Sequence, residues 1–236
     1  MVNAARSARP LRILFVEDDP VIGEATLAHL ERHRYEAVWV TDGLEAWERF
    51  SDPGSTPFDV VLCDVMLPGM DGVTLCRRVR EVATTPFVLV SARGDAIDVV
   101  GGLEAGADDY VVKPFEVQVL LARLRSVVRR AEAVPISAAG RAVEQFGDLT
   151  LDRSALELRR DGRLLTLTPT EMKLFLELAE SPGTVLSRRT LLARVWDYDD
   201  WGADSHLVDV HIQRLRSKVG TAHIETVRGF GYKLRP

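Results

Sequence analysis

The sequence is poor in cysteine and has no long apolar run. Two cysteines among 236 residues are too few for a disulfide framework or a cysteine zinc site. No stretch approaches the roughly 18 apolar residues of a membrane-spanning helix, so we expect no membrane association. Residues 1–10 are basic but lack an apolar core, so we expect a short disordered tail and no secretory signal. Together these features predict a cytoplasmic protein with reduced, buried thiols.

The chain also lacks a net positive charge, although the charge is unevenly distributed. The formal net charge is −5, which by itself argues against a nucleic-acid-binding protein. Residues 205–236 nevertheless carry six cations and two anions, whereas the 61 residues before them have a net charge of −4. A small basic surface is therefore predicted near the C-terminus, beside an acidic body.

The first half alternates short apolar runs with helical patterns. The run LRILFV at 11–16 is typical of a buried parallel strand, and Asp19-Pro20 after it is typical of a helix start. Five such strand–helix units over 11–130 predict an α/β domain with a doubly wound, five-stranded parallel sheet. The later strands are expected at 36–40, 59–64, 87–91 and within 107–115, and the later helices at 43–50, 73–80, 95–104 and 117–130.

The pattern changes after residues 131–143, which are small, Ala-rich and interrupted by Pro and Gly, as in a linker. Residues 146–168 alternate apolar and polar side chains, which predicts an antiparallel meander. Helices are expected from the capping box Thr168-Pro169-Thr170-Glu171, from Ser187, and over 206–219, with a closing hairpin in TVRGFGYKL. Residues 144–236 should therefore form a separate α+β domain.

Polar side chains follow four strands of the predicted parallel sheet, at the edge where such sheets bind ligands. They are Glu17 and Asp18 after the first strand, Asp64 after the third, Ser91 after the fourth and Lys113 after the fifth. Carboxylates without His or Cys form an oxygen-rich site suited to Mg²⁺. A carboxylate beside such a cation can attack a phosphoryl group, with the lysine neutralising the product.

Each of these residues also has a plainer interpretation. Asp64 before a loop could be a turn residue, and Lys113 could be a solvated strand end. Their coincidence at one sheet edge favours the functional interpretation.

The expected helix over 206–219 has two faces. A cationic, hydrogen-bonding face is formed by His211, Arg214 and Lys218, with Gln213 alongside, and such a helix fits the major groove of DNA. The alternative is a solvated surface helix, but Arg228 in the hairpin adds a second basic contact. The opposite face forms a core stripe of Val208, Ile212, Leu215 and Val219.

The segments FVEDDP, VLCDVMLPGMDG, LVSAR and GADDYVVKPF resemble those of bacterial receiver domains, over about residues 11–130. The resemblance implies a flavodoxin-like fold in which Asp64 accepts a phosphoryl group from a sensor histidine kinase. It further implies that Asp18, Asp64 and the backbone carbonyl of Met66 ligate Mg²⁺, with Glu17 acting through a water or by contacting these ligands from behind.

The same resemblance implies roles around the phosphoryl group. Ser91 would bond a phosphoryl oxygen, Lys113 would pair with it, and Tyr110 would swing inward when Ser91 moves. Pro114 in this motif typically follows a cis peptide bond.

The C-terminal half resembles the winged-helix effector domain of the OmpR/PhoB class of response regulators. The segments LTPTEMKLFLELAESPGTVLSRRTLLARVW, VDVHIQRLRSKVG and TVRGFGYKL carry the resemblance over 144–236. It implies that the 206–219 helix enters the major groove, Arg228 enters the minor groove, and the loop WDYDDWGADS faces RNA polymerase. One departure is Gln213, where the family often has arginine, because Gln favours adenine and Arg favours guanine.

A second departure concerns the family's dimer interface. The lysine and glutamate that commonly pair across its two-fold axis correspond to Val99 and Val119 here, whereas Asp109 and Arg123, which match another pair, are present. The sequence thus predicts a homodimer on phosphorylation, with an apolar contact in place of an ion pair.

Taken together, the chain is interpreted as a two-domain transcriptional response regulator that dimerises on phosphorylation and binds tandem promoter half-sites. It would have no enzymatic activity beyond phosphorylating and dephosphorylating itself. Two alternatives stay open: a phosphohydrolase with an aspartyl-phosphate intermediate, and a regulator that works without phosphorylation. Such phosphohydrolases usually carry the nucleophile on the first strand and a cap over the site, whereas the candidate nucleophile here ends the third strand. The complete set of Glu17, Asp18, Asp64, Ser91 and Lys113 argues against a regulator that works without phosphorylation.

Overall fold

The computed structural model describes residues 9–92, 96–132, 143–198 and 206–236, with the backbone alone for 96–99. The chain divides into two compact units, Met1–Val128 and Arg129–Pro236, and each is described by itself. The tail expected at 1–10 and the linker expected at 131–143 fall almost entirely outside the described residues. Among the residues described, no helix is both long and apolar enough to cross a membrane.

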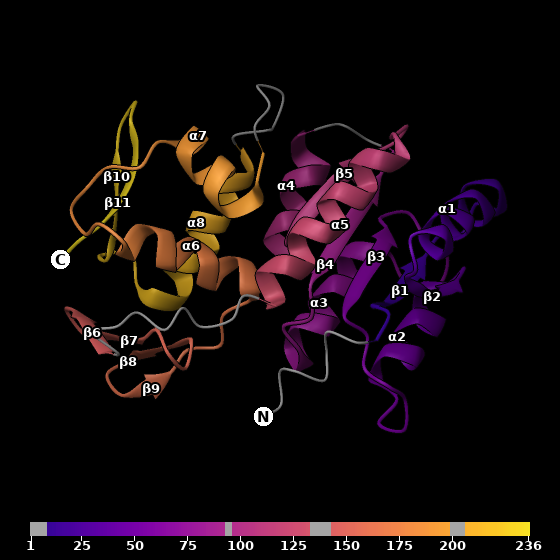
Figure 1. Ribbon diagram of the computed structural model, residues 1–236, viewed down its shortest axis with the longest axis horizontal. Helices are drawn as coiled ribbons and strands as arrows, with labels where there is room; N and C mark the ends of the chain where they lie inside the picture. Colours follow the sequence, from indigo (N-terminus) through magenta and orange to yellow (C-terminus); the bar gives the residue numbers. More distant parts are fainter. Residues whose placement is uncertain (1–8, 93–95, 133–142, 199–205) are drawn as a thin grey trace. The chain divides into compact units, whose positions relative to one another are not determined.

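The first unit contains the expected five-stranded parallel sheet, with strand order β2-β1-β3-β4-β5 (Figure 1). The fold class predicted from the alternating strand and helix patterns is therefore confirmed. Strands β3 and β4 are buried along their whole length, as expected for continuous apolar runs covered on both faces. The strands are β1 (Arg12–Val16), β2 (Glu36–Val40), β3 (Val60–Asp64), β4 (Phe87–Ser91) and β5 (Asp109–Val112).

Helices cover both faces of this sheet. Leu30 of the first helix and the apolar side of the fifth pack on one face, in one core with β1, β3, β4 and β5. The second, third and fourth helices pack against one another on the other face. Asp19, Asp42 and Asp71 cap the first three helices by accepting backbone N–H groups. The helices are α1 (Pro20–Arg32), α2 (Gly43–Ser51), α3 (Gly72–Val82), α4 (Ala96–Ala105) and α5 (Val117–Glu132).

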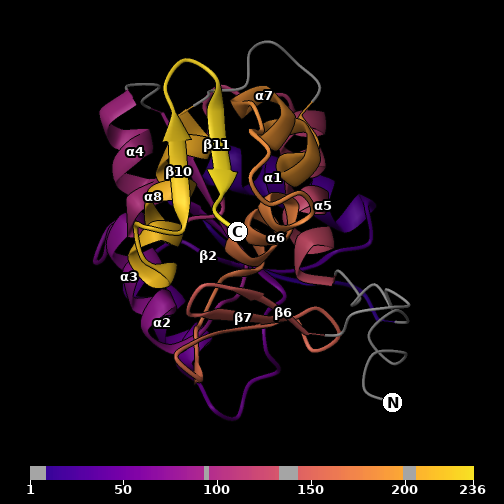
Figure 2. The same cartoon turned by 90° about the vertical axis from the view of Figure 1, so that its left-hand side faces the viewer.

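The second unit begins with the expected antiparallel meander and ends with the expected hairpin (Figure 2). Helices lie between them in the described residues. The meander is β6 (Val143–Phe146), β7 (Leu149–Asp152), β8 (Glu157–Arg160) and β9 (Arg163–Leu164); the helices are α6 (Pro169–Ala179), α7 (Arg188–Leu191) and α8 (His206–Val219); the hairpin is β10 (Ile224–Val227) and β11 (Gly231–Leu234).

The helix starts in this unit follow the sequence signals. Thr168 and Glu171 form both hydrogen bonds of the capping box at the start of α6, and Ser187 caps α7. The helix expected from Ser187 differs in one respect, because after Leu191 it continues as a π-helical segment, η2 (Leu192–Trp196), which ends at Asp197 with a left-handed φ of 60°. The predicted core stripe of α8 is buried.

Candidate functional site

Three carboxylates meet at the carboxyl edge of the parallel sheet. Glu17 and Asp18 follow β1 and Asp64 ends β3, and one oxygen of each lies within 4.8 Å of the other two. Glu17 and Asp64 are buried, whereas Asp18 is exposed. The cluster is therefore anchored in the sheet and open to solvent on one side.

Lys113, directly after β5, joins two of these carboxylates. Its Nζ donates to Glu17 Oε1 and Oε2 at 2.8 and 2.7 Å, and to Asp64 Oδ2 at 2.5 Å. Burial raises the pKa of Glu17 despite the opposing effect of Lys113. Burial opposes the charge of Lys113 too, but its hydrogen bonds to Asp64 and Glu17 prevail and raise the pKa of the ammonium group. The Lys113–Pro114 peptide bond is cis, as the receiver resemblance implied.

The loop after Asp64 is held close to the cluster. Met66 N donates to Asp64 Oδ1 at 3.1 Å, and Gly72 N donates to Val65 O at 2.9 Å. A Cβ added to Gly72 would lie 2.1 Å from the backbone oxygen of Asp64, so only glycine lets α3 begin this close to the end of β3. The backbone around Met66 is thus fixed beside the carboxylates.

The residues at this edge fit a hard divalent cation. The three carboxylates offer only oxygen ligands, and their oxygens are close enough together to bind one ion. Lys113 is hydrogen-bonded to two of them, Glu17 and Asp64, and offsets part of the repulsion among the three carboxylates. The structure therefore supports a metal site at the acidic cluster of Glu17, Asp18 and Asp64.

Ser91 and Tyr110 occupy the two strands beside the cluster. Ser91 ends β4 and is buried, and its carbonyl accepts the backbone N–H of Lys113 at 2.7 Å. Tyr110 lies on β5, with the guanidinium of Arg123 6.0 Å from its ring centre. Arg123 also pairs with Asp109 at 3.0 Å within the same chain.

The second candidate site is α8, and here the structure corrects the predicted cationic face. His211 is fully buried, with its ring centre 5.1 Å from that of Trp196, so it belongs to the core and not to a DNA-facing surface. Its position on the helix lies next to the core stripe, which is why it packs inward.

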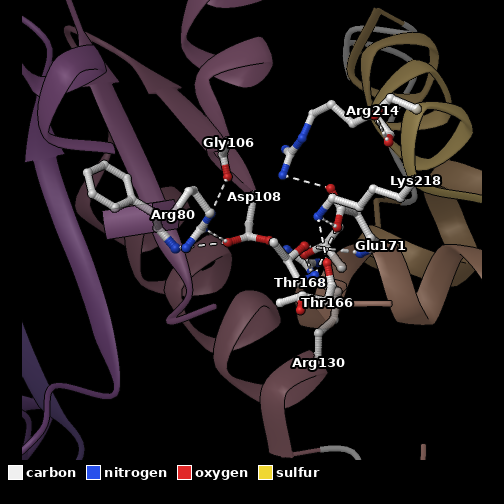
Figure 3. Close-up of polar contacts among 12 residues, drawn as sticks. Arg80, Gly106, Asp108, Arg130, Thr166, Thr168, Glu171, Arg214 and Lys218 are labelled. Carbon is white, nitrogen blue, oxygen red and sulfur yellow. Dashed lines mark hydrogen bonds and ion pairs between the residues drawn. The ribbon is translucent and has the colours of Figure 1, made fainter. Parts of the chain in front are cut away.

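Arg214 and Lys218 point toward α6 (Figure 3). Both pair with Glu171, at 3.0 Å from Arg214 Nη2 and 2.6 Å from Lys218 Nζ, and Lys218 also donates to the Thr166 carbonyl. The carboxylate of Glu171 is fully buried and additionally accepts the backbone N–H of Thr168. These two cations therefore hold α8 against α6 in this structure.

The exposed face of α8 carries Gln213 and Ser217, flanked by Asp209 and Arg216. Arg216 donates to the Ile224 carbonyl of β10, which ties the hairpin to α8. Sequence reasoning placed Gln213 beside the reading face but missed Asp209 and Arg216. Their spacing from Gln213, four and three residues, could have identified them as its neighbours on one helix face.

The tip of the β10–β11 hairpin is exposed. Arg228 lies in the tight turn with Gly229, whose φ is +79°, and the next residue, Phe230, is 71% exposed. Arg228 is therefore presented at a protruding loop, as a wing residue would be.

The predicted dimer residues lie on α4, β5 and α5. Val119 of α5 is 42% exposed, and Val112 of β5 adds a further 37% exposed apolar side chain. The backbone of Val99 lies in α4, but its side chain is outside the described residues. The acidic loop expected to face RNA polymerase is also mostly outside them.

Two family models match this chain. The response regulator receiver domain matches residues 13–125, and the C-terminal domain of transcriptional regulatory proteins matches residues 162–234. Both matches lie inside the domains expected from the sequence.

Curated relatives match along nearly the whole chain. The transcriptional regulatory protein CseB of Streptomyces coelicolor is 55% identical, over 94% of this chain and 97% of its own. The DNA-binding response regulator MtrA of Mycolicibacterium smegmatis is 40% identical, over 95% and 97%. Among solved structures, the Thermotoga maritima OmpR/PhoB homologue DrrB is similar with a TM-score of 0.51 and 30% identity, over 96% of this chain and all of DrrB. This chain belongs to the OmpR/PhoB class of two-component response regulators, which regulate transcription by binding DNA.

Proposed function

We propose that this regulator is switched by phosphorylation of Asp64 with bound Mg²⁺. The observation that supports this most directly is the Lys113 ammonium group, which contacts both Asp64 and Glu17 at the edge where three carboxylates gather. A buried carboxylate beside a fixed cation is arranged to become a doubly charged acyl phosphate.

The step is a transfer between two side chains. One Oδ of Asp64 forms a bond to phosphorus while the P–N bond of the kinase's phosphohistidine breaks, and the leaving imidazole takes up a proton. Lys113 and the hydroxyl of Ser91 then hold phosphoryl oxygens, and the movement of Ser91 is followed by Tyr110. Asp18, Asp64 and the Met66 carbonyl would hold Mg²⁺, with Glu17 behind them; the ion would neutralise charge on the phosphoryl oxygens.

We further propose that phosphorylation favours a homodimer through α4, β5 and α5, which brings two DNA-binding units to tandem promoter half-sites. The exposed valines of this face, Val112 and Val119, support the proposal.

Gln213 would contact bases in the major groove and Arg228 would enter the minor groove, since both side chains are exposed. Arg214 and Lys218 would reach DNA only by leaving Glu171. RNA polymerase is the proposed partner of the loop at 196–205. The location is proposed to be the cytoplasm, where the buried Cys63 and Cys76, which form no disulfide, would stay reduced.

The test combines a small-molecule phosphodonor with selection of bound DNA from random duplexes. Wild-type protein should become labelled only with Mg²⁺, and its affinity for the selected DNA should rise on labelling. Asp64→Asn should lose the label and the rise in affinity while keeping its fold. The matched control is Asp52→Asn. Asp52 is exposed, and the Oδ1 atom of an asparagine could still accept the hydrogen bond from Gly54 N.

Two results would contradict the proposal. Labelling of Asp64→Asn at the wild-type rate would move the phosphoacceptor elsewhere. Equal DNA affinity with and without the label would favour the alternative of a regulator that works without phosphorylation.

A further inference from the structure

One carboxylate stands on the exposed face of α8. Asp209 Oδ1 accepts hydrogen bonds from Arg188 Nε of α7 at 2.6 Å and from the Tyr232 hydroxyl of β11 at 2.7 Å. Arg188 Nη2 also donates to the Tyr232 oxygen at 3.0 Å, so the three groups close a triangle that joins α7, α8 and the hairpin. Each hydrogen bond of the triangle therefore joins two different elements.

Two arginines lie close to the ring of Tyr232. The guanidinium of Arg188 is 4.9 Å and that of Arg216 is 5.6 Å from the ring centre. Burial, together with the hydrogen bond to Asp209, raises the pKa of Tyr232 to about 12, so its hydroxyl stays protonated and keeps donating.

The triangle is next to the residues proposed to read DNA. Asp209 and Gln213 are four residues apart on α8, and therefore lie on one face of the helix. Asp209 and Arg188 remain partly exposed, with 36% and 31% of their side chains accessible. The carboxylate of Asp209 repels DNA phosphates at this position. It also pairs with Arg188, which could otherwise bind a phosphate.

We propose that Asp209 is a positioning residue that sets DNA specificity by holding Arg188 in place and withholding it from the phosphates of non-cognate DNA. The proposal rests on the DNA binding proposed above. Non-specific affinity comes almost wholly from cations that neutralise phosphates, each of which steepens the dependence of affinity on salt. While Arg188 is paired with Asp209, it does not add to the non-specific affinity for DNA, whereas the exposed amide of Gln213 can still contact bases.

The experiment measures binding of the full chain to the selected duplex and to a random duplex of equal length, over a series of salt concentrations. For Asp209→Asn, the salt slope on random DNA should steepen by about 0.9, the contribution of one added phosphate contact. The ratio of specific to non-specific affinity should fall about fivefold. Adding Arg188→Ala to Asp209→Asn should return the slope to the wild-type value.

The matched control is Asp161→Asn. Asp161 is exposed in the turn before β9, and its left-handed φ of 49° is one that Asn tolerates. It makes the same change in net charge in the meander rather than on α8, and it should leave slope and ratio as in wild type. If Asp209→Asn behaves as Asp161→Asn does, or if the double variant keeps the steeper slope, the proposal is wrong.

Tyr232→Phe provides a second test that keeps the ring and its packing. It removes one hydrogen bond to Asp209 and one from Arg188, so the slope should steepen in the same direction by a smaller amount. An unchanged slope in this variant would also contradict the proposal, even if Asp209→Asn failed to fold. Failure of wild-type protein to select any DNA would instead refute the proposed DNA-binding role itself.

Discussion

A single glycine, Gly72, controls how closely α3 approaches the proposed phosphoacceptor. A Cβ at this position would meet the Asp64 backbone oxygen at 2.1 Å and Cys63 Sγ at 3.0 Å. Gly72→Ala should therefore destabilise the first unit by about 1–3 kcal/mol, the usual cost of overpacking, and slow labelling by a phosphodonor because the end of β3 must shift. Urea unfolding and labelling rates measure the two effects.

Gly101→Ala is the control for this prediction. Gly101 lies in α4, and among the described residues no atom beyond its chain neighbours and its own helix backbone lies within 4 Å of an added Cβ, so alanine should stabilise the helix by about 0.5–1 kcal/mol. If Gly72→Ala were as stable and as readily labelled as Gly101→Ala, the close approach of α3 would not matter for the site.

At the scale of helices and strands, the buried carboxylate of Glu171 joins α6 to α8. Glu171→Ala would leave Arg214, Lys218 and the Thr168 N–H without this partner. The second unit should lose about 3–5 kcal/mol of unfolding free energy, as when one member of a buried ion pair is removed. Glu157→Ala is the control, because its pair with Arg159 is exposed on both sides and should contribute about 0–1 kcal/mol. Similar unfolding midpoints for the two variants would contradict the prediction.

The strands and the acidic edge were predictable because their signals are local. A continuous apolar run followed by a carboxylate, as in β3 and Asp64, identifies both a buried parallel strand and the sheet edge where it ends. The capping box of α6 was likewise readable from Thr168 and Glu171 alone.

The functional face of α8 was not predictable in the same way. Its core stripe was correct, but which polar side chains face solvent depends on neighbours far away in the sequence. Trp196 attracts His211, and Glu171 attracts Arg214, over separations that periodicity does not report. The π-helical segment η2 also had no signal in the spacing of apolar residues.

At the scale of the whole molecule, the proposed dimer predicts a charge rescue. Val119→Glu should weaken dimerisation on phosphorylation, because it puts a charge where an apolar contact would contribute up to roughly 1.5–3 kcal/mol per buried side chain. Adding Val99→Lys should restore it by forming an ion pair across the two-fold axis. Sedimentation of the phosphodonor-treated variants measures both effects.

The control variant is Val82→Glu. Val82 ends α3, an element that is not part of the proposed interface of α4, β5 and α5, and it is 65% exposed. It should dimerise as wild type does. If Val119→Glu did the same, the proposed face would not be the interface.

The three contacts of Glu171 also have an evolutionary consequence. One carboxylate serves the start of α6 and two cations of α8, so a substitution at 171 changes the surroundings of residues 214 and 218 together. Lineages that replace the glutamate should accumulate changes at both cationic positions, whereas either cation alone could drift while the other keeps the carboxylate paired. Covariation across the family should therefore be strongest as a triplet.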